Sequence, residues 1–556
     1  MMNKIMNAKK GQAGSSDSSI AEIVYISYLV VLYFVRGIGC YEGQLLFNIA
    51  LVIGLLLFGG KVLLTKHSFF EYLAIVLFIA LGAIIYYKTG EKWFLLNITM
   101  LLGIKGIDPK KALNAVFYVL IITFTVCFVL CMTGLVEPLR MLHPKTGLGY
   151  VLCYGMIYAH PNSLHSMFLL ITALTIYKVG LVKGKKLLLF LVALIITNLY
   201  IFLYTFSYTG FLTVNILIFL YVVMCIRESI SKFGKVILQL IFPFCLVFSM
   251  IGPLVIKGKA FDLINKLLST RYNLSRYFLT EQPKTLFGTI FVIPDYLEHY
   301  TMDCSYVYLF MQYGIIAFIL MCIGYFMLIN YQIRKNMKLE LAITLAFCIG
   351  GIAEPYLFNS SFKNITLIFM GLMFYENISG KIESSVLSKS FQILNIESPV
   401  LASIGDMDSS SKEIAIKKPK LNEGGRMARP LKNSDPKYLK LLAIPAIIGI
   451  ICTLIFVLVT DNINGLYISE ALNQARSSGA PVLYLTEDQV SELEDEGYEV
   501  LDYISVNEPM YAYFDKAGTM EYARRVVSVM LWSFVLTIII ELIYIQKNDH
   551  GSYNCE

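Results

Sequence analysis

The chain has 556 residues, of which 57% are hydrophobic and 15% are charged, and its mean hydropathy is +0.66. This composition excludes a soluble globular protein, because a soluble core has no room for so much apolar surface. The formal net charge of +7 does not indicate nucleic acid as a partner. Most Lys and Arg residues lie in short loops between apolar stretches, where they orient membrane helices.

The first apolar run, 20–35, follows a basic N-terminus and lacks a small-residue cleavage site. It predicts an uncleaved first span, with residues 1–19 in the cytoplasm. Further apolar runs of suitable length bring the expected number of spans in residues 20–376 to about twelve. They are expected at 44–64, 69–87, 93–104, 112–135, 149–177, 187–204, 211–226, 236–256, 305–330, 339–356 and 365–375. The predicted fold class is an all-α polytopic membrane protein.

Orientation follows from the basic loops. With the N-terminus inside, alternation of the spans places the lysine-rich loops 105–111 and 183–186 in the cytoplasm, which agrees with the positive-inside rule. The same alternation places residues 257–303 outside. This external loop has about 45 residues, enough for structure of its own.

The composition changes after the last of these spans. Residues 377–438 are rich in Ser, Lys and Asp, which predicts a flexible cytoplasmic linker. Residues 439–545 predict a two-span module whose middle, 461–523, lies outside, followed by a cytoplasmic tail, 546–556. Strand-like runs flank a helix start at 486–488 in the middle part, which predicts a small extracytoplasmic α/β domain.

Two polar breaks interrupt the apolar pattern. His160-Pro161-Asn162 lies inside the expected span 149–177, where polar groups are costly unless they face protein or water. It is interpreted as the lining of a cavity, although a proline kink with satisfied neighbours explains the same residues. The second break includes Ser207 and would lie near the mouth of an outward-facing cavity, or form a tight hairpin.

Basic residues gather in the first half of the loop 257–303, which breaks the usual charge rule for external loops. Arginine presents a planar fork that matches phosphate oxygens, so Arg271 and Arg276, with Lys266 nearby, suit a lipid-linked pyrophosphate. On one continuous helix the two arginines diverge by about 140°, so they converge only if the segment is broken or wraps the ligand. Binding of anionic lipid headgroups without catalysis would explain the same charges.

Near its end the loop carries an imidazole, carboxylates and hydroxyls, close to the point where the chain enters the next expected span. His299, Asp303 and Tyr306 lie there. A base that removes a proton from a sugar hydroxyl needs a pKa near neutrality. His299, Glu298 and Asp303 are each candidates for this base, and the spacing does not choose among them. Neither a CxxC nor a metal-ligand spacing occurs among the eleven cysteines, and no cofactor is expected.

In this order, these motifs resemble the O-antigen ligase and polysaccharide polymerase superfamily. The residues that carry the resemblance are Gly147-Leu148-Gly149, His160-Pro161-Asn162, Ser207, Arg271 and Arg276 before Leu286-Phe287-Gly288, Asp303-x-Ser305-Tyr306, and Tyr313-Gly314. The resemblance covers residues 20–375 and does not extend to the segment after them. It implies an inverting, metal-independent transfer of a glycan from undecaprenyl pyrophosphate to a sugar hydroxyl, on the outer face of a bacterial plasma membrane.

The resemblance also implies roles for the residues. Arg271 and Arg276 would stabilise the leaving diphosphate, while His299 or Asp303 would accept the proton of the attacking hydroxyl. The residues expected to bind substrate are His160, Asn162, Ser207, Lys266 and Tyr306. The expected partners are lipid-linked oligosaccharides, membrane lipid, and the flippase and chain-length regulator of the same pathway.

A polymerase, which joins repeat units on one lipid carrier, is the favoured function. A ligase that moves glycan to another acceptor is the nearest alternative. A transporter or flippase of lipid-linked oligosaccharide would show a similar number of spans, but it usually has matched broken helices in its two halves, and none are seen here. The C-terminal module has the helix, external domain, helix layout of chain-length regulators with a shorter external part, and an accessory anchor is the more favoured interpretation.

Overall fold

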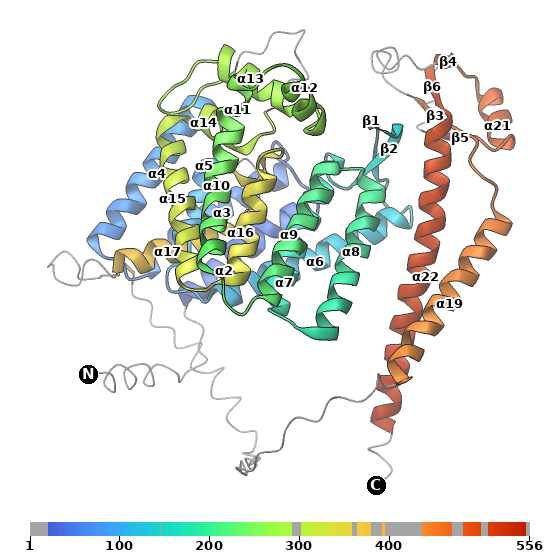
Figure 1. The fold of residues 1–556 in the computed structure, drawn as a ribbon, viewed down its shortest axis with the longest axis horizontal. Coiled ribbons are helices and arrows are strands. Elements are labelled where there is room, and N and C mark those ends of the chain that lie inside the picture. Colours follow the sequence, from blue (N-terminus) through green and yellow to red (C-terminus); the bar gives the residue numbers. More distant parts are fainter. Residues whose placement is uncertain are drawn as a thin grey trace. The chain divides into compact units, whose positions relative to one another are not determined.

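The computed structural model describes residues 20–145, 147–291, 302–358, 364–379, 392–394, 436–469, 482–501 and 510–551. Within these residues the chain is mostly helical (Figure 1). It divides into two compact units. The first comprises Met1–Leu139 and Tyr154–Lys412, and the second comprises Arg140–Cys153 and Glu413–Glu556.

In the described part of the chain, nine helices are long and apolar enough to cross a membrane. Those in the first unit are α2 (Ile20–Gly37), α3 (Leu45–Leu64), α4 (Phe69–Thr89), α6 (Pro109–Met132), α8 (Gly184–Thr205), α9 (Tyr208–Ile226), α10 (Lys232–Met250) and α15 (Gly314–Arg334). At a rise of about 1.5 Å per residue, the shortest reaches about 27 Å, close to the thickness of a hydrocarbon layer. The chain is therefore a polytopic, mainly α-helical membrane protein, as its composition predicted.

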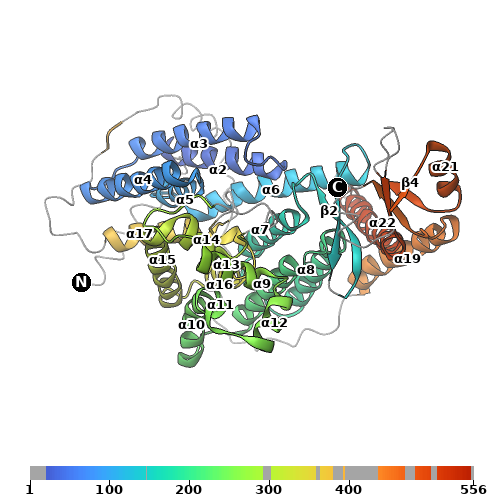
Figure 2. The same cartoon turned by 90° about the horizontal axis from the view of Figure 1, so that it is seen from above.

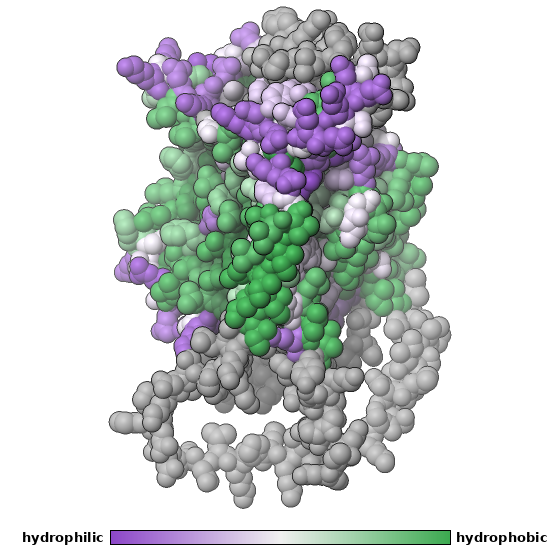
Figure 3. Space-filling model, turned by 90° about the vertical axis from the view of Figure 1, so that its right-hand side faces the viewer, coloured by the Kyte–Doolittle hydropathy of each residue, from purple (hydrophilic) through white to green (hydrophobic). Residues whose placement is uncertain are grey.

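Shorter helices fill the interior of the first unit, and most of their side chains are buried. They are α5 (Trp93–Gly103), α7 (Pro161–Val179), α14 (Ser305–Gln312), α16 (Lys338–Gly350) and α17 (Thr366–Ser379). Helices α7, α9 and α16 lie side by side (Figures 1 and 2). The long helices expose large apolar side chains such as Leu56, Val76 and Phe219, which suits contact with lipid tails. Figure 3, which views the right-hand side of Figure 1, shows hydrophobic side chains below hydrophilic ones on the visible face.

The prediction of a single span over 149–177 is wrong. Gly147 and Gly149 have φ angles of 86° and 75°, in the left-handed region that glycine adopts without strain, and they form the turn of a hairpin. Pro161 occupies the first turn of α7, where its missing N–H is not needed. His160 therefore lies at the start of a helix and not deep within one. The hairpin strands are β1 (Leu139–Lys145) and β2 (Gly149–Met156).

The expected span 305–330 is divided into α14 and α15 at Gly314, whose φ angle is 85°. The middle of the large loop packs on this break. The amide of Ile315 donates to the carbonyl of Thr285 at 3.0 Å, and that of Ile316 donates to Leu286 at 3.2 Å. A side chain at Gly314 would come within 2.5 Å of the Leu286 carbonyl oxygen. Only glycine allows this close approach, so the loop is fixed to the start of α15.

The first part of the large loop is helical. It forms α11 (Gly252–Val255), α12 (Gly258–Leu267) and α13 (Arg271–Glu281). These helices lie together at one end of the first unit (Figure 1). Near the same end, α16 stops at Gly350 and is followed by the short 3₁₀ helix η2 (Pro355–Leu357). The arrangement brings several chain breaks to one end of an apolar bundle.

The second unit contains two long helices and a small sheet. Helix α19 (Pro436–Val459) packs along α22 (Asp515–Gly551). The sheet has the order β4-β6-β3-β5, and β3 is parallel to β5 but antiparallel to β6. Tyr467, Leu485 and Val490 form the core between the sheet and α21. The remaining bounds are β3 (Leu466–Ser469), β4 (Val482–Tyr484), α21 (Glu487–Asp495), β5 (Glu499–Leu501) and β6 (Met510–Phe514).

Candidate functional site

One carboxylate, that of Glu354, gathers polar side chains from three distant parts of the first unit. Its Oε1 atom accepts hydrogen bonds from Asn162 Nδ2 at 3.3 Å and from Arg271 Nη2 at 3.1 Å, and a further one from the hydroxyl of Thr209. Glu354 is only 5% exposed. A buried charge is stable only when it is paired and hydrogen-bonded, and this cluster meets both conditions. We call Asn162, Thr209, Arg271, Asp303 and Glu354 the Glu354 cluster.

Arg271 joins the large loop to this cluster. Its Nε atom lies 3.2 Å from Oδ2 of Asp303, while its Nη2 atom contacts Glu354. The Nε atom is buried and, among the described residues, makes no well-aligned hydrogen bond, so the contact with Asp303 is an ion pair only. Arg271 therefore pairs with two carboxylates at once.

The backbone of the cluster is fixed by Ser305, at the start of α14. Its hydroxyl donates to the Glu354 carbonyl at 2.6 Å and accepts from the Leu357 amide at 3.2 Å, and its amide donates to the Gly351 carbonyl at 2.9 Å. These three bonds connect the start of α14 to the chain that follows α16. Because Asp303 is two residues before Ser305, they also hold Asp303 beside Glu354.

Helices α7 and α9 both begin at the cluster. His160 caps α7, where its Nδ1 atom accepts from the Asn162 amide at 3.1 Å, and Ser207 caps α9, where its hydroxyl accepts from the Gly210 amide at 3.3 Å. Asn162 and Thr209 are thus in the first turns of the two helices. The partial positive charge of a helix N-terminus favours a nearby carboxylate, which explains why Glu354 is stable there.

Beneath these caps, a buried histidine connects three helices. His165 in α7 bonds to Thr205 at 2.9 Å and to Asn198 in α8 at 3.0 Å, and Asn198 donates to the carbonyl of Phe211 in α9 at 3.3 Å. Gly210 packs directly on the His165 ring. Side-chain networks of this kind specify one arrangement of the elements that they join. The hydrogen bonds of His165 and Asn198 therefore fix α7 and α9 relative to each other, and with them the distance between Asn162 and Thr209.

The structure brings Asn162, Arg271 and Asp303 of the predicted site together, and places His160 and Ser207 as the caps beside them. Arg276 has other partners. Its guanidinium donates to the carbonyls of Pro253 at 2.6 Å and Ile256 at 2.7 Å, and lies 3.7 Å from the centre of the Phe261 ring. The two arginines belong to one continuous helix, α13, and they diverge as its geometry requires. Arg276 holds α11 and α12 in place.

The other predicted residues lie in different surroundings. Tyr306 is buried and donates to the Cys348 carbonyl at 2.7 Å, so its hydroxyl stabilises the core. Lys266 is exposed on α12. His299 and Glu298 lie outside the described residues. Cys304, next to Asp303, is a poor nucleophile, because burial raises the pKa of its thiol and keeps it protonated.

Neither Glu354 nor Thr209 is among the site residues predicted from the sequence. Glu354 had a usable signal, since it is an acid within the expected span 339–356, and ionisable residues in such segments are usually functional. Thr209 had no signal beyond its place in the polar break after Ser207. The Glu354 cluster itself carries one positive and two negative charges. Any anionic ligand would therefore also need the cations of the adjoining loop.

In the part of the chain that the structure describes, no group of three or more His, Cys, Asp or Glu residues could hold a metal ion. Comparison with family models, with curated proteins and with solved structures finds no match to this chain.

Proposed function

We propose that this protein is a membrane glycosyltransferase that polymerises lipid-linked glycan. The substrate would be an oligosaccharide on undecaprenyl pyrophosphate, and the acceptor would be a sugar hydroxyl of a second lipid-linked repeat unit. The observation that carries the proposal is the pairing of Arg271, on a loop helix, with Asp303 and Glu354 at the end of the apolar bundle. A cation and carboxylates at this position suit a substrate whose head is anionic and whose tail is lipid.

The arrangement of the spans supports one extracytoplasmic site. We propose twelve crossings in the first unit, by α2 to α10, α15, α16 and α17. If the N-terminus is inside, alternation assigns the starts of α7 and α9, the loop after α10 and the end of α16 to the outer side. The Glu354 cluster is built from these four places. The hydrogen bonds of the cluster join residues as far apart as 192 positions in the sequence. They are consistent with this alternation of the spans, which assigns all of these residues to the same side.

The proposed chemistry of the cluster consists of stabilising the leaving diphosphate and accepting a proton from the attacking hydroxyl. The guanidinium of Arg271 would meet the negative charge that develops on the leaving diphosphate, since preorganised donors lower such barriers. The exposed loop cations Lys259 and Lys266 would offset the second carboxylate of the cluster. Asp303, whose side chain is 28% exposed, would accept the proton of the attacking hydroxyl, with His299 as the alternative base. Glu354 is buried and would position Arg271.

The cellular setting completes the proposal. The enzyme would lie in a bacterial plasma membrane with both termini in the cytoplasm, in the pathway of a capsule, exopolysaccharide or O-antigen. Helices α19 and α22 would cross the membrane and hold the small sheet outside. In that position the second unit suits an accessory role beside the flippase and the chain-length regulator of the pathway.

The proposal is tested with the purified full-length protein in liposomes that contain lipid-linked repeat units. The wild-type protein should lengthen the glycan, as measured by gel electrophoresis. Arg271→Ala should abolish lengthening, and Arg271→Lys should restore it poorly, because a point charge lacks the bidentate fork. Lys284→Ala is the matched control, since Lys284 is an exposed cation of the same loop, and it should leave the product unchanged.

Arg276→Ala separates a structural from a chemical role. It removes two hydrogen bonds to loop carbonyls, so it should reduce glycan lengthening together with the thermal stability of the protein. Arg271→Lys keeps a positive charge beside Glu354, so it should reduce lengthening with a smaller loss of stability than Arg276→Ala. Movement of the substrate across the bilayer with no change in glycan length would contradict a polymerase and indicate a flippase.

A further inference from the structure

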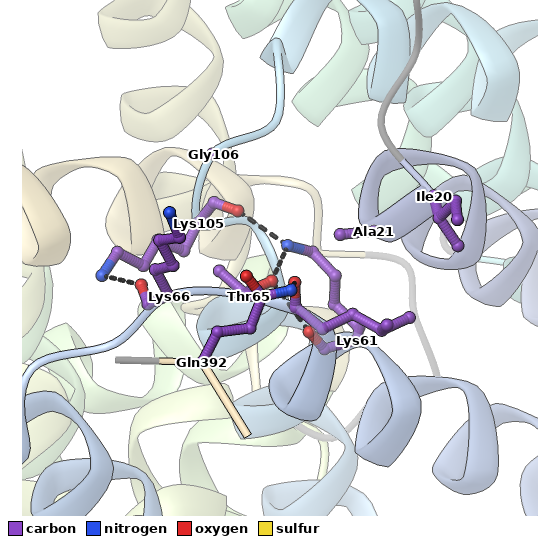
Figure 4. A pocket seen from close by; sticks show the side chains of 9 residues that line it. Ile20, Ala21, Lys61, Thr65, Lys66, Lys105, Gly106 and Gln392 are labelled. Carbon is purple, nitrogen blue, oxygen red and sulfur yellow. Dashed lines mark hydrogen bonds between the residues drawn. The ribbon is translucent and has the colours of Figure 1, made fainter. Parts of the chain in front are cut away.

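A cavity of about 420 Å³ lies away from the Glu354 cluster, where α3 ends and α6 begins (Figure 4). Its wall has a polar part made of three lysines, Thr65 and Gln392, and an apolar part made of residues at the start of α2 and the end of α3. The lining residues are Ile20, Ala21, Lys61, Leu64, Thr65, Lys66, Lys105, Gly106 and Gln392. A cavity of this volume is within the range of small-molecule sites in proteins.

Positive charge exceeds negative charge in this cavity. Lys105 pairs with Glu71, and the nearby Glu22 pairs with Lys111 at 2.7 Å. Lys61 is only 2% exposed. The hydrogen bonds described for its ammonium go to neutral oxygens, at 2.6 Å to the Thr65 hydroxyl and at 2.8 Å to the Lys105 carbonyl (Figure 4).

A buried ammonium whose hydrogen bonds go to neutral acceptors has lost its hydration, and the carboxylate that acts on Lys61, that of Glu22, is shared with Lys111. Lys66 is exposed at the rim of the cavity, so a second ammonium is within the same lining. The site therefore has two cations in excess of its carboxylates. An anion in the cavity would supply the missing counter-charge.

The apolar and polar parts of the wall restrict the ligand further. Ile20 and Leu64 border the cavity beside the lysines, so the ligand can combine an anionic group with apolar carbon. Gln392 closes another side. Its amide donates to the carbonyl of Leu64 at 2.9 Å, and the amide of Leu394 donates to Leu63 at 3.1 Å. A segment that follows α17 in the chain thus forms part of the wall.

We propose that this cavity binds the phosphate group of a phosphate ester, with Lys61 and Lys66 as its ligands. The ester is either the headgroup of an anionic phospholipid or a soluble phosphorylated compound, because both carry the same group. Lysine binds phosphate as a point charge with three donors, which suits a cavity whose lining includes the ammonium groups of Lys61 and Lys66. The site does not depend on the glycosyltransferase activity proposed above.

The test uses full-length protein in nanodiscs of phosphatidylcholine, with or without phosphatidylglycerol. Native mass spectrometry measures the phosphatidylglycerol that remains bound after transfer to detergent. Isothermal titration calorimetry with glycerol phosphate, in phosphatidylcholine nanodiscs, measures binding of a soluble ester. Retention of phosphatidylglycerol alone identifies a lipid site, and binding of glycerol phosphate identifies a soluble ligand. Failure of both probes to bind overturns the proposal.

The variants assign the binding to the cavity. Lys61→Gln combined with Lys66→Gln should weaken binding of the probe by about tenfold or more, since it removes two charged donors. Lys66→Gln alone breaks no described hydrogen bond of the fold, so it should weaken binding several-fold even if the double variant folds poorly. Lys185→Gln, at an exposed position of another loop, is the matched control. Equal binding by Lys66→Gln and the control would overturn the proposal.

Discussion

Replacing Glu354 by glutamine tests whether the carboxylate positions Arg271 for the proposed transfer. In the wild-type protein Oε1 of Glu354 accepts from Asn162, Thr209 and Arg271. Glutamine has nearly the same shape but carries no charge and presents an NH₂ group to these donors. The change therefore alters the electrostatics of the site with little change in volume.

The size of the effect follows from the partners of Arg271. Removing one member of a buried ion pair costs about 3–5 kcal/mol. Arg271 keeps Asp303 at 3.2 Å, and the glutamine carbonyl can still accept one hydrogen bond. We therefore expect a cost of about 2 kcal/mol, at the low end of the range for charged hydrogen bonds. If this interaction is needed in the transition state, the rate of glycan lengthening falls about 30-fold.

The assay measures the initial rate of lengthening at saturating donor, with thermal unfolding of the same preparation. Glu340→Gln is the matched control, because Glu340 belongs to α16 but lies at the opposite end of the helix from Glu354, where its side chain bonds to Tyr177. It should leave the rate unchanged. Glu354→Asp keeps the charge but withdraws it by about one C–C bond, ~1.5 Å. It should give an intermediate rate, because position as well as charge is altered.

A folded Glu354→Gln variant that lengthens glycan within twofold of the wild-type rate would contradict a positioning role for Glu354. The same holds if Glu340→Gln loses as much activity as Glu354→Gln. A rise in the donor KM with an unchanged kcat would show that Glu354 contributes to ground-state binding and not to the position of Arg271 in the transition state.

Two further predictions concern topology and the proton acceptor. A cysteine introduced at Lys284 should react with an impermeant thiol reagent in intact cells, while one at Lys185 should not, because the basic loops are expected in the cytoplasm; the opposite labelling would invert the orientation. His299→Ala should retain donor binding but lose transfer if the imidazole is the base. A normal rate for His299→Ala across neutral pH, together with a large loss for Asp303→Asn, would assign the role to Asp303.

The membrane class and most of the helices can be predicted from the sequence alone. Long apolar runs separated by basic loops are local features, and the bilayer thickness converts their length directly into structure. The same local reasoning located the break at His160-Pro161-Asn162 and the basic loop with Arg271. It failed over 149–177, because the apolar residues of β2 and α7 form one run in which hydrophobicity does not distinguish a buried strand from a helix.

The polar residues that contact one another become apparent only in the folded protein. Glu354 lies 192 positions from Asn162, 145 from Thr209 and 83 from Arg271, and no periodicity in one sequence reports a contact over such a separation. The two arginines of α13 were equivalent by residue type, yet one pairs with carboxylates and the other with loop carbonyls, because helix geometry directs them to different sides. Burial gives this difference a chemical consequence. A charge inside the protein requires a partner, and the fold must supply it.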